Sequence, residues 1–218
     1  MTTNTSGGAA RARRGRTILA SGRLGQWRTI DLLTCAFLGV AFGAIYWAWG
    51  IAYEGPSNLL SAPFAPLSAL AAWPWLMAGV IGGLVIRRPG AALFAEVLAA
   101  AVSMLIVTKW GAMTFVSGLV QGLGAELGFL IFGYRRFGAR AAMLAGALAG
   151  ALEAIFEWYS YWTDWDMTYK VAYLVLLSAA GAVLAGLLSL ALTRGLARAG
   201  ALNALPPGQE ARESRTQA

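Results

Sequence analysis

The sequence predicts an all-α integral membrane protein, a bundle of six transmembrane helices with both termini in the cytoplasm. Of its 218 residues, 58% are hydrophobic and only 12% are charged. Soluble domains carry roughly a quarter charged residues, so this chain lacks the polar side chains that would cover a water-facing surface. Long apolar stretches recur along most of the chain, and a bilayer is the solvent that accepts them.

The six expected spans each have the roughly 20 mainly apolar residues that cross a bilayer. The second contains Pro74, which predicts a kink because proline removes a helix hydrogen bond. We expect one membrane domain, residues 30–195, between a disordered basic N-terminal tail, residues 1–29, and a cytoplasmic C-terminal tail, residues 196–218. The predicted spans cover residues 31–50, 66–86, 91–108, 112–133, 139–161 and 168–194.

The connections between the spans alternate in charge. One side holds the arginines of both tails and the arginine pairs at 87–88 and 135–136. The other side holds two basic residues, Lys109 and Lys170. The positive-inside rule therefore places both termini in the cytoplasm, as an even number of spans also requires. Topology and anionic lipid headgroups account for the net charge of +7, so we do not predict a nucleic-acid partner.

Several functional classes are disfavoured by residue types that the sequence lacks. With one cysteine, Cys35, and no histidine, it has neither a disulfide framework nor a Cys/His metal site, and it cannot use histidine catalysis. The chain has no phosphate-binding G-x-x-x-x-G-K-[ST] loop, so it cannot hydrolyse ATP by that route. No nucleophile–base pair is readable. We therefore predict a protein that is not an enzyme and has no metal or cofactor.

Four glutamates, Glu96, Glu126, Glu153 and Glu157, lie within the predicted spans. An acid at the centre of a bilayer costs at least about 2.5 kcal/mol, and the interiors of the spans offer no basic residue to neutralise it. Such acids must be protonated, hydrogen-bonded or waiting for a cation. Glu153 and Glu157 are i,i+4 neighbours on one helix face. They predict a cavity wall that attracts positive charge.

Tryptophan and tyrosine concentrate on the side of the membrane opposite the termini. Tyr46 and Trp47 lie near the end of the first span, and Trp110 follows the third. An interfacial aromatic belt would explain them, but a belt should appear at both faces, and the cytoplasmic face has only Trp27 and Tyr134. We therefore expect some outer aromatics to build a site for a flat, cationic, ring-containing ligand.

Small residues in the first span leave two interpretations open. Gly39 and Gly43 form a G-x-x-x-G motif, which close packing inside the bundle would explain. The alternative is a docking face for a partner membrane subunit, so both glycines are candidate partner-interface residues.

Several segments resemble the YkoE family, over about residues 27–195. The glycine-glutamine-glutamate block of the fourth span is the most specific of them. The matching segments are residues 27–31 (WRTID), 39–50 (GVAFGAIYWAWG), 88–96 (RPGAALFAE), 117–129 (SGLVQGLGAELGF) and 134–136 (YRR).

YkoE proteins are substrate-binding (S) subunits of energy-coupling-factor (ECF) transporters, which are ABC-type importers. The resemblance implies the six-helix S-subunit fold in the inner (cytoplasmic) membrane. It also implies thiamine or its precursor hydroxymethylpyrimidine (HMP) as the ligand. The implied partners are a membrane coupling (T) subunit and cytoplasmic ATPase subunits.

The residues and the resemblance agree on ligand chemistry, because thiamine has a permanent cation and an aminopyrimidine ring. Glu153 and Glu157 would favour the cation, and Gln121 would pair with the pyrimidine edge. Glu96 and Glu126 either reach this site or tie the third and fourth helices together. The remaining candidate binding residues are the wall residues Tyr46, Trp47 and Trp110 and a lid residue, Asn58.

A second function stays open on the residues alone. A self-contained proton- or cation-coupled transporter would also carry paired acids in a membrane cavity. Many such transporters show an inverted repeat, and none is obvious in these spans. Such a protein would accumulate solute on its own under a proton gradient, whereas an S subunit alone binds its ligand without transport.

Overall fold

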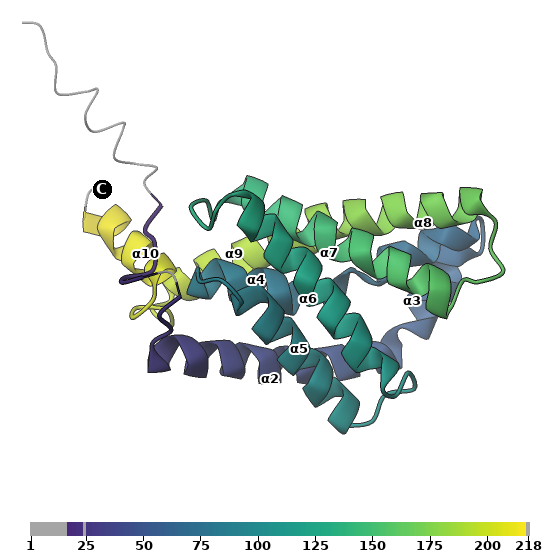
Figure 1. Cartoon of the computed structure of the whole chain (residues 1–218), viewed down its shortest axis with the longest axis horizontal. Helices are drawn as coiled ribbons and strands as arrows, with labels where there is room; N and C mark the ends of the chain where they lie inside the picture. The colour runs from purple at the N-terminus through teal and green to yellow at the C-terminus, as the bar shows by residue number, and fades with distance from the viewer. Residues whose placement is uncertain (1–16, 24, 217–218) are drawn as a thin grey trace, which may run out of the picture.

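The computed structural model describes residues 17–23 and 25–216, and the regular structure of these residues is entirely helical (Figure 1). The all-α prediction is confirmed for this part of the chain. In chain order the elements are α2 (Thr29–Ala52), α3 (Glu54–Ser61), η1 (Ala65–Ala71), η2 (Trp73–Leu76), α4 (Met77–Ile86), α5 (Ala91–Leu105), α6 (Met113–Ile131), α7 (Ala139–Ser160), α8 (Met167–Ala180), the π-helical turn η3 (Gly181–Gly186), α9 (Leu187–Arg198) and α10 (Pro206–Thr216).

Four of the described helices are long and apolar enough to cross a membrane, and two further predicted spans differ in form. η1 and the stretch Trp73–Ile86 form a pair bent by 49°, which counts as one broken span or as a re-entrant segment. Pro74 lies in the first turn of η2, directly after the break, where its missing N–H costs no helix bond. α5 is an apolar helix of only 15 residues. The four long helices are Thr29–Ala52, Met113–Ile131, Ala139–Ser160 and Met167–Arg198.

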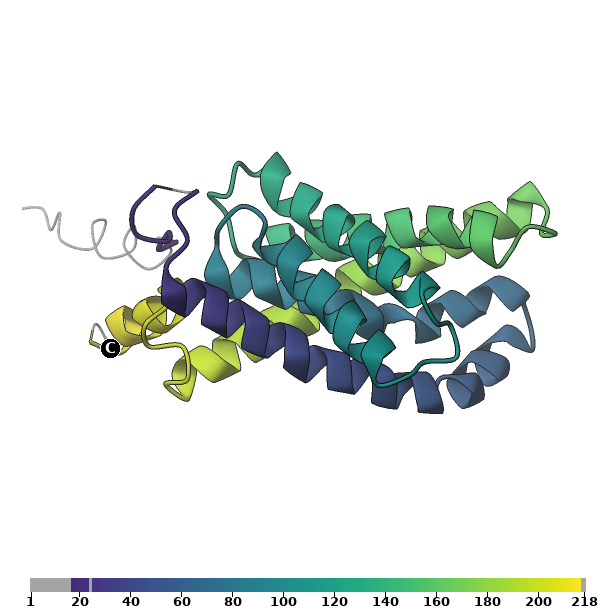
Figure 2. The same ribbon diagram turned by 60° about the horizontal axis from the view of Figure 1, so that its bottom comes forward.

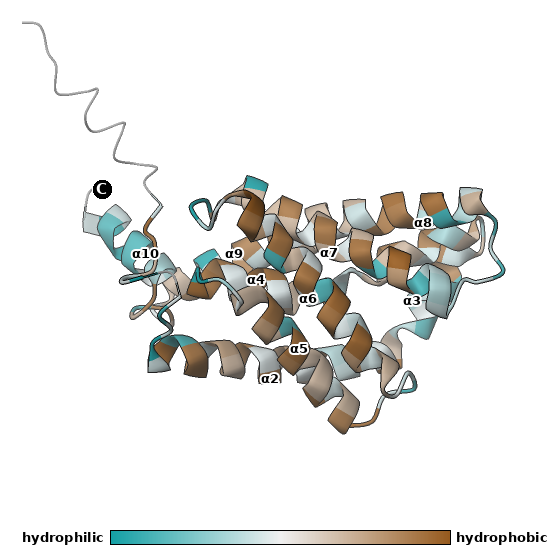
Figure 3. Cartoon of the chain, viewed as in Figure 1, coloured by the Kyte–Doolittle hydropathy of each residue, from teal (hydrophilic) through white to brown (hydrophobic). Residues whose placement is uncertain are grey.

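α2 and α8 run along the long axis on opposite edges of the molecule, and α5 and α6 cross obliquely between them (Figure 1). α10 and the start of α2 lie together at one end, which we call the terminal end (Figures 1 and 2). α3 and the α7–α8 loop lie at the opposite end, which we call the distal end. Large apolar side chains face outward on the bundle: Phe37 is 72% exposed. The bundle is mainly hydrophobic and α10 is hydrophilic, as expected when lipid surrounds only the bundle (Figure 3).

Glycines let α6, α7 and η3 approach at backbone distance. A Cβ atom on Gly124 would lie 2.5 Å from the carbonyl oxygen of Leu148 on α7. A Cβ atom on Gly146 of α7 would collide with the carbonyl oxygen of Gly181, the first residue of the π-helical turn. Small residues at such crossings give the close packing that holds helices together where lipid removes the hydrophobic driving force.

The helix surface at Gly39 and Gly43 is covered by another helix in the same way, which contradicts the assignment of these two glycines to a partner interface. A Cβ atom on Gly39 would lie 2.8 Å from Leu98, and one on Gly43 would lie 2.6 Å from Val102. Both neighbours belong to α5. The G-x-x-x-G motif therefore packs α2 against α5 within the chain, and its surface is not free for a second subunit.

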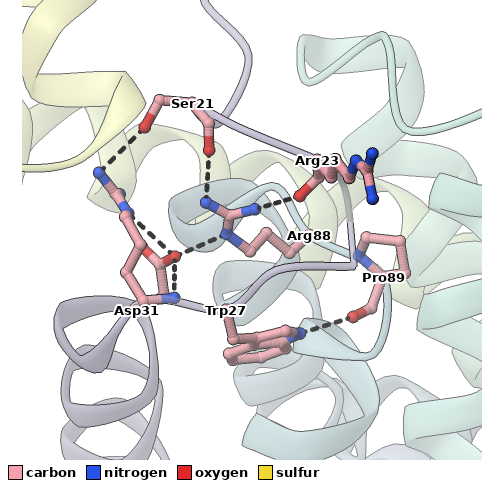
Figure 4. A network of polar contacts seen from close by, with 7 residues as sticks. Ser21, Arg23, Trp27, Asp31, Arg88 and Pro89 are labelled. Atoms are coloured by element: carbon pink, nitrogen blue, oxygen red, sulfur yellow. Dashed lines mark hydrogen bonds and ion pairs between the residues drawn. The ribbon is translucent and has the colours of Figure 1, made fainter.

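A buried ion pair organises the terminal end. Arg88 Nε lies 2.6 Å from Asp31 Oδ2, and both side chains are 0% exposed. Arg28 also pairs with Asp31, at 2.7 Å. The other guanidinium nitrogens of Arg88 donate to the carbonyl oxygens of Ser21 at 2.8 Å and Arg23 at 3.0 Å (Figure 4). A buried charge needs this many partners because an unpaired one is very costly.

The described residues ahead of α2 are therefore held against the bundle. Besides the two carbonyl contacts to Arg88, the Trp27 indole N–H donates to the carbonyl oxygen of Pro89 at 3.3 Å (Figure 4). This differs from the expectation of a disordered tail up to residue 29, because backbone carbonyls of the tail satisfy a buried guanidinium. Residues 1–16 and 24 lie outside the described part of the chain.

The C-terminal segment also packs at the terminal end. The predicted polar tail forms the helix α10 from Pro206, and its Glu210 carboxylate pairs with Arg87, at the end of α4. Glu210 also accepts the backbone N–H of Ile18, whose carbonyl accepts from Arg87. One acid thus joins α4, α10 and the described segment ahead of α2.

We expect Asp31→Asn to lower the free energy of unfolding by about 3–5 kcal/mol, because it leaves the fully buried Arg88 guanidinium without a counter-charge. Thermal unfolding in detergent measures the loss. The matched control is Glu54→Gln, which breaks an ion pair to Lys109 of the same 2.6 Å length at an exposed site. Its cost should stay below about 1 kcal/mol. Equal losses would show that burial does not set the strength of the Asp31 pair.

Gly146→Ala should destabilise the bundle by about 1–3 kcal/mol, because the added methyl forces α7 away from the backbone of η3. Gly195→Ala on α9 is the control, since a Cβ atom there meets nothing within 4 Å. That change should leave stability unchanged or raise it by up to about 1 kcal/mol. The two melting temperatures, measured in the same detergent, separate a packing effect from a general effect of alanine.

Candidate functional site

The structure contains a cavity of about 270 Å³ towards the distal end of the bundle. Its walls come from α2, α3, η2, α5, α6 and α7 and from the loops that follow α5 and α7. The volume lies just below the range of about 300–1,000 Å³ that holds drug-sized ligands, so it suits a smaller molecule. Six predicted site residues line it: Tyr46, Glu96, Trp110, Gln121, Glu153 and Glu157.

Glu153 ends a chain of hydrogen bonds that starts on α6. Gln121 Nε2 donates to Ser117 Oγ at 2.8 Å, and Ser117 Oγ donates to Glu153 Oε1. Glu153 Oε2 is buried and has no hydrogen-bond partner among the described residues. The same holds for Glu157 Oε2 and for the indole nitrogen of Trp162, which also line the cavity. Buried polar atoms left without partners cost free energy, and a bound molecule would supply the missing partners.

Glu96, on α5, is hydrogen-bonded to two other helices. Its carboxylate accepts from the Tyr46 hydroxyl, with 2.9 and 3.0 Å to the two oxygens, and from the backbone N–H of Gly79 at 2.6 Å. The Tyr46 hydroxyl in turn accepts from the backbone N–H of Ala78. Glu96 therefore lines the cavity, and it also ties α5 to α2 and α4 rather than to α6, the helix of the fourth predicted span.

Three aromatic rings, of Tyr53, Trp75 and Trp110, pack together in the cavity wall. Trp75 packs against Tyr53 and Trp110, with ring centroids 4.7 Å and 5.2 Å apart. Lys109 Nζ lies 4.7 Å from the Trp110 ring and 2.6 Å from Glu54 Oε1 on α3. The hydrogen bond from Lys109 lowers the pKa of the exposed Glu54 carboxyl. This pair links α3 to the α5–α6 loop over the aromatic cluster.

Glu126, predicted as a binding residue, does not line the cavity. Its carboxylate accepts the backbone N–H groups of Gly90, Ala92 and Leu93, at 2.6, 3.0 and 3.2 Å, where α5 begins. It also accepts from the Tyr134 hydroxyl at 2.6 Å, and burial beside this acid raises the pKa of Tyr134. The first turn of a helix has free N–H groups and a positive dipole end, so an acid there is stabilising. Glu126 is a structural cap for α5.

Two further predicted binding residues are also absent from the cavity wall. Trp47 is 37% exposed on the outside of α2, because the neighbouring Tyr46 takes the inward position. Asn58 is exposed on α3, whereas the adjacent Ser57 lines the cavity.

Several residues of the cavity wall were not predicted from the sequence. Ser117 lies one helical turn before Gln121, so i,i+4 spacing could have identified it. For Trp75 and Trp162, the only signal of a binding role in the sequence is their position on the outer side of the membrane. A place in an outer loop is enough to explain Lys109. Among the described residues, no group of three or more Cys, Asp and Glu side chains is arranged to hold a metal ion.

Fold and site together define a multi-pass membrane protein with an internal, acidic, aromatic-lined cavity for a small solute. Residues 30–152 match the sequence model of a protein family described as the permease component of ABC-type cobalt transport systems. The chain is 31% identical to the Bacillus subtilis (strain 168) protein YkoE, whose name describes an HMP/thiamine permease, over 88% of this chain and 96% of that protein. A crystal structure of an S-component of an ECF transporter matches with a TM-score of 0.80 at 30% identity, over 88% of this chain and 96% of that one.

The chain belongs to the YkoE family of ECF-transporter S-components. It is a substrate-binding subunit and a multi-pass protein of the cytoplasmic membrane. The sequence-based assignment to this family and class is confirmed.

Glu126→Gln should lower the free energy of unfolding by about 1–3 kcal/mol, because an amide replaces the acceptor of three N–H groups at the start of α5. Amide hydrogen exchange should accelerate at Gly90, Ala92 and Leu93 and remain slow in α7. Glu213→Gln, an exposed change on α10, is the control and should alter neither quantity. Unchanged exchange at the start of α5 would contradict the capping role.

Proposed function

We propose that this chain captures thiamine or HMP in the cavity and delivers it inward with ATPase-driven partners. One observation carries the ligand chemistry: buried oxygens of Glu153 and Glu157 have no partner in the described chain, in a cavity walled by Trp75 and Trp110. Carboxylates attract a cation, and aromatic faces stack on flat rings. The related YkoE, named as an HMP/thiamine permease, supports the same ligand class.

We also propose a six-span topology with both termini in the cytoplasm. The bent η1–α4 pair and the short α5 would complete the four long helices. Arginines gather at the terminal end, including those at 87–88, whereas Lys109 and Lys170 lie towards the distal end. In this orientation the cavity faces the outside, as a capture site for uptake requires.

The partners we propose are a membrane coupling subunit and cytoplasmic ATPase subunits, with binding rather than chemical turnover as the role of this chain. The chain lacks a phosphate-binding loop of its own. Because α5 covers Gly39 and Gly43, the coupling subunit must dock on another face.

Reconstitution separates this function from the self-contained transporter. Liposomes that contain the purified chain alone should bind ligand without accumulating it under a proton gradient. Addition of coupling and ATPase subunits with ATP should start uptake. Accumulation by the chain alone, driven by the gradient, would favour the coupled transporter.

Thr114→Trp should abolish binding of thiamine and HMP, because Thr114 lines the cavity and the indole would fill it. Isothermal titration calorimetry on the purified chain measures binding, and the wild type should bind at least one of the two ligands with micromolar or better affinity. Val116→Trp is the control on the same helix, since Val116 is 40% exposed on the outer surface. Retained binding in Thr114→Trp, or loss in Val116→Trp, would place the ligand elsewhere.

A further inference from the structure

The free acceptors of the cavity fall into two groups along α7, and we propose that they form two subsites. Gln121, Ser117 and Glu153 form an edge that takes the amino group of the pyrimidine ring. Glu157, with Trp162 beside it in the wall, forms a second subsite that takes a positive charge and so selects a cationic ligand over a neutral one. This inference rests on the proposed function and divides its site.

The first subsite presents hydrogen-bond acceptors. Gln121 Nε2 is used in donating to Ser117 Oγ, and the Ser117 hydroxyl is used in donating to Glu153 Oε1. This direction of the chain leaves Glu153 Oε2 without a partner. It does not use the amide oxygen of Gln121, which is an acceptor on a residue of the same wall. An exocyclic amino group has two N–H donors, so it fits these atoms. An oxo group at the same ring position would place acceptor against acceptor.

The second subsite lies one helical turn away. Glu157 follows Glu153 by four residues on α7, which displaces it by about 6 Å towards the distal end. Its Oε2 atom and the indole N–H of Trp162 are buried with no partner within hydrogen-bond distance. The side chains of Trp162 and Tyr173 lie next to the Glu157 carboxyl group. In thiamine a single methylene joins the aminopyrimidine to the charged thiazolium ring, whereas HMP has a neutral hydroxymethyl group there. When the pyrimidine occupies the first subsite and the ligand lies along α7 towards the distal end, the charge falls near Glu157.

The other charged groups of the wall are already engaged. Glu96 accepts from Tyr46 and from Gly79, so its oxygens have donors within the chain. Lys109, a basic residue of the described cavity wall, lies 2.6 Å from Glu54 and does not neutralise Glu157. The two acids with a free oxygen, Glu153 and Glu157, can therefore have different tasks.

A matched pair of substitutions tests the division. Glu157→Gln should weaken thiamine binding by about tenfold or more, because it removes a charge next to the cation, and should change HMP affinity by less than threefold. Glu153→Gln, the same change one turn earlier, should weaken both ligands by similar factors, because both carry the amino group. Equal losses of both ligands in Glu157→Gln, or a thiamine-selective loss in Glu153→Gln, would overturn the two subsites.

Wild-type protein provides a test that does not depend on the folding of a variant. A neutral thiamine analogue, with carbon in place of the thiazolium nitrogen, should bind the wild type about tenfold more weakly than thiamine and should lose nothing more in Glu157→Gln. Analogues of thiamine and HMP with an oxo group in place of the amino group should lose binding at least as strongly. Full affinity for the neutral analogue would overturn the cation subsite, and full affinity for the oxo analogues would overturn the acceptor edge.

The failures of the two proposals are distinguishable. If folded wild-type protein binds neither thiamine nor HMP, the proposed function fails and the subsites fail with it. If the wild type binds both and the variants and analogues show no selectivity, the function stands and only the division of the site is overturned.

Discussion

A carboxylate buried in this bundle is removed from bulk water, so it needs hydrogen-bond donors from the chain or from what occupies the cavity. Asp31 accepts hydrogen bonds from two arginines, and Glu126 accepts them from backbone N–H groups at the start of α5. Glu96 accepts them from a tyrosine and a backbone N–H. Each of these acids joins segments that are far apart in sequence, so satisfying the acids also fixes the arrangement of the helices. Glu153 and Glu157 depart from this rule, because each keeps an oxygen without a donor among the described residues, and both face the cavity. The unmet requirement of these two acids is what makes the cavity a binding site.

Apolar length could predict most of the spans, because lipid accepts only helices whose backbone groups are satisfied internally. It could not predict which side of a helix faces inward. Tyr46 and Trp47 point about 100° apart on α2, and both are aromatic residues near the distal end of a helix whose exposed and buried faces are both hydrophobic. Because neither face of α2 is polar, the sequence does not show whether Tyr46 or Trp47 faces the inside of the bundle. Of these two residues only Tyr46 lines the cavity, because its hydroxyl has hydrogen-bond partners there, Glu96 and the backbone N–H of Ala78.

For a related reason, the sequence could not show which glutamates line the cavity and which only hold helices together. Glu96 and Glu126 lie at a similar predicted depth, and the difference between them is the set of donors that the fold brings near. Those around Glu126 come from the first turn of α5, some 35 residues earlier in the chain, and such a long-range contact leaves no local pattern. Ser117 is the opposite case, because its link to Gln121 is one helical turn long and could be read from spacing. Local hydrogen bonds were predictable in principle, and contacts between helices were not.

The two ends of the bundle differ in how easily they can open. At the terminal end, Asp31 and Arg88 are fully buried, and separating them would leave charges without partners, at a cost of about 3–5 kcal/mol. At the distal end, the Lys109–Glu54 pair is exposed, so water replaces either partner and the pair is worth at most about 1 kcal/mol. Movement that admits a ligand is therefore cheaper at the distal end. The difference comes from the burial of the two pairs, not from the number of arginines at each end. It nevertheless selects the same face that the positive-inside rule would turn towards the outside, so charge distribution and bond strength both favour entry from the external side.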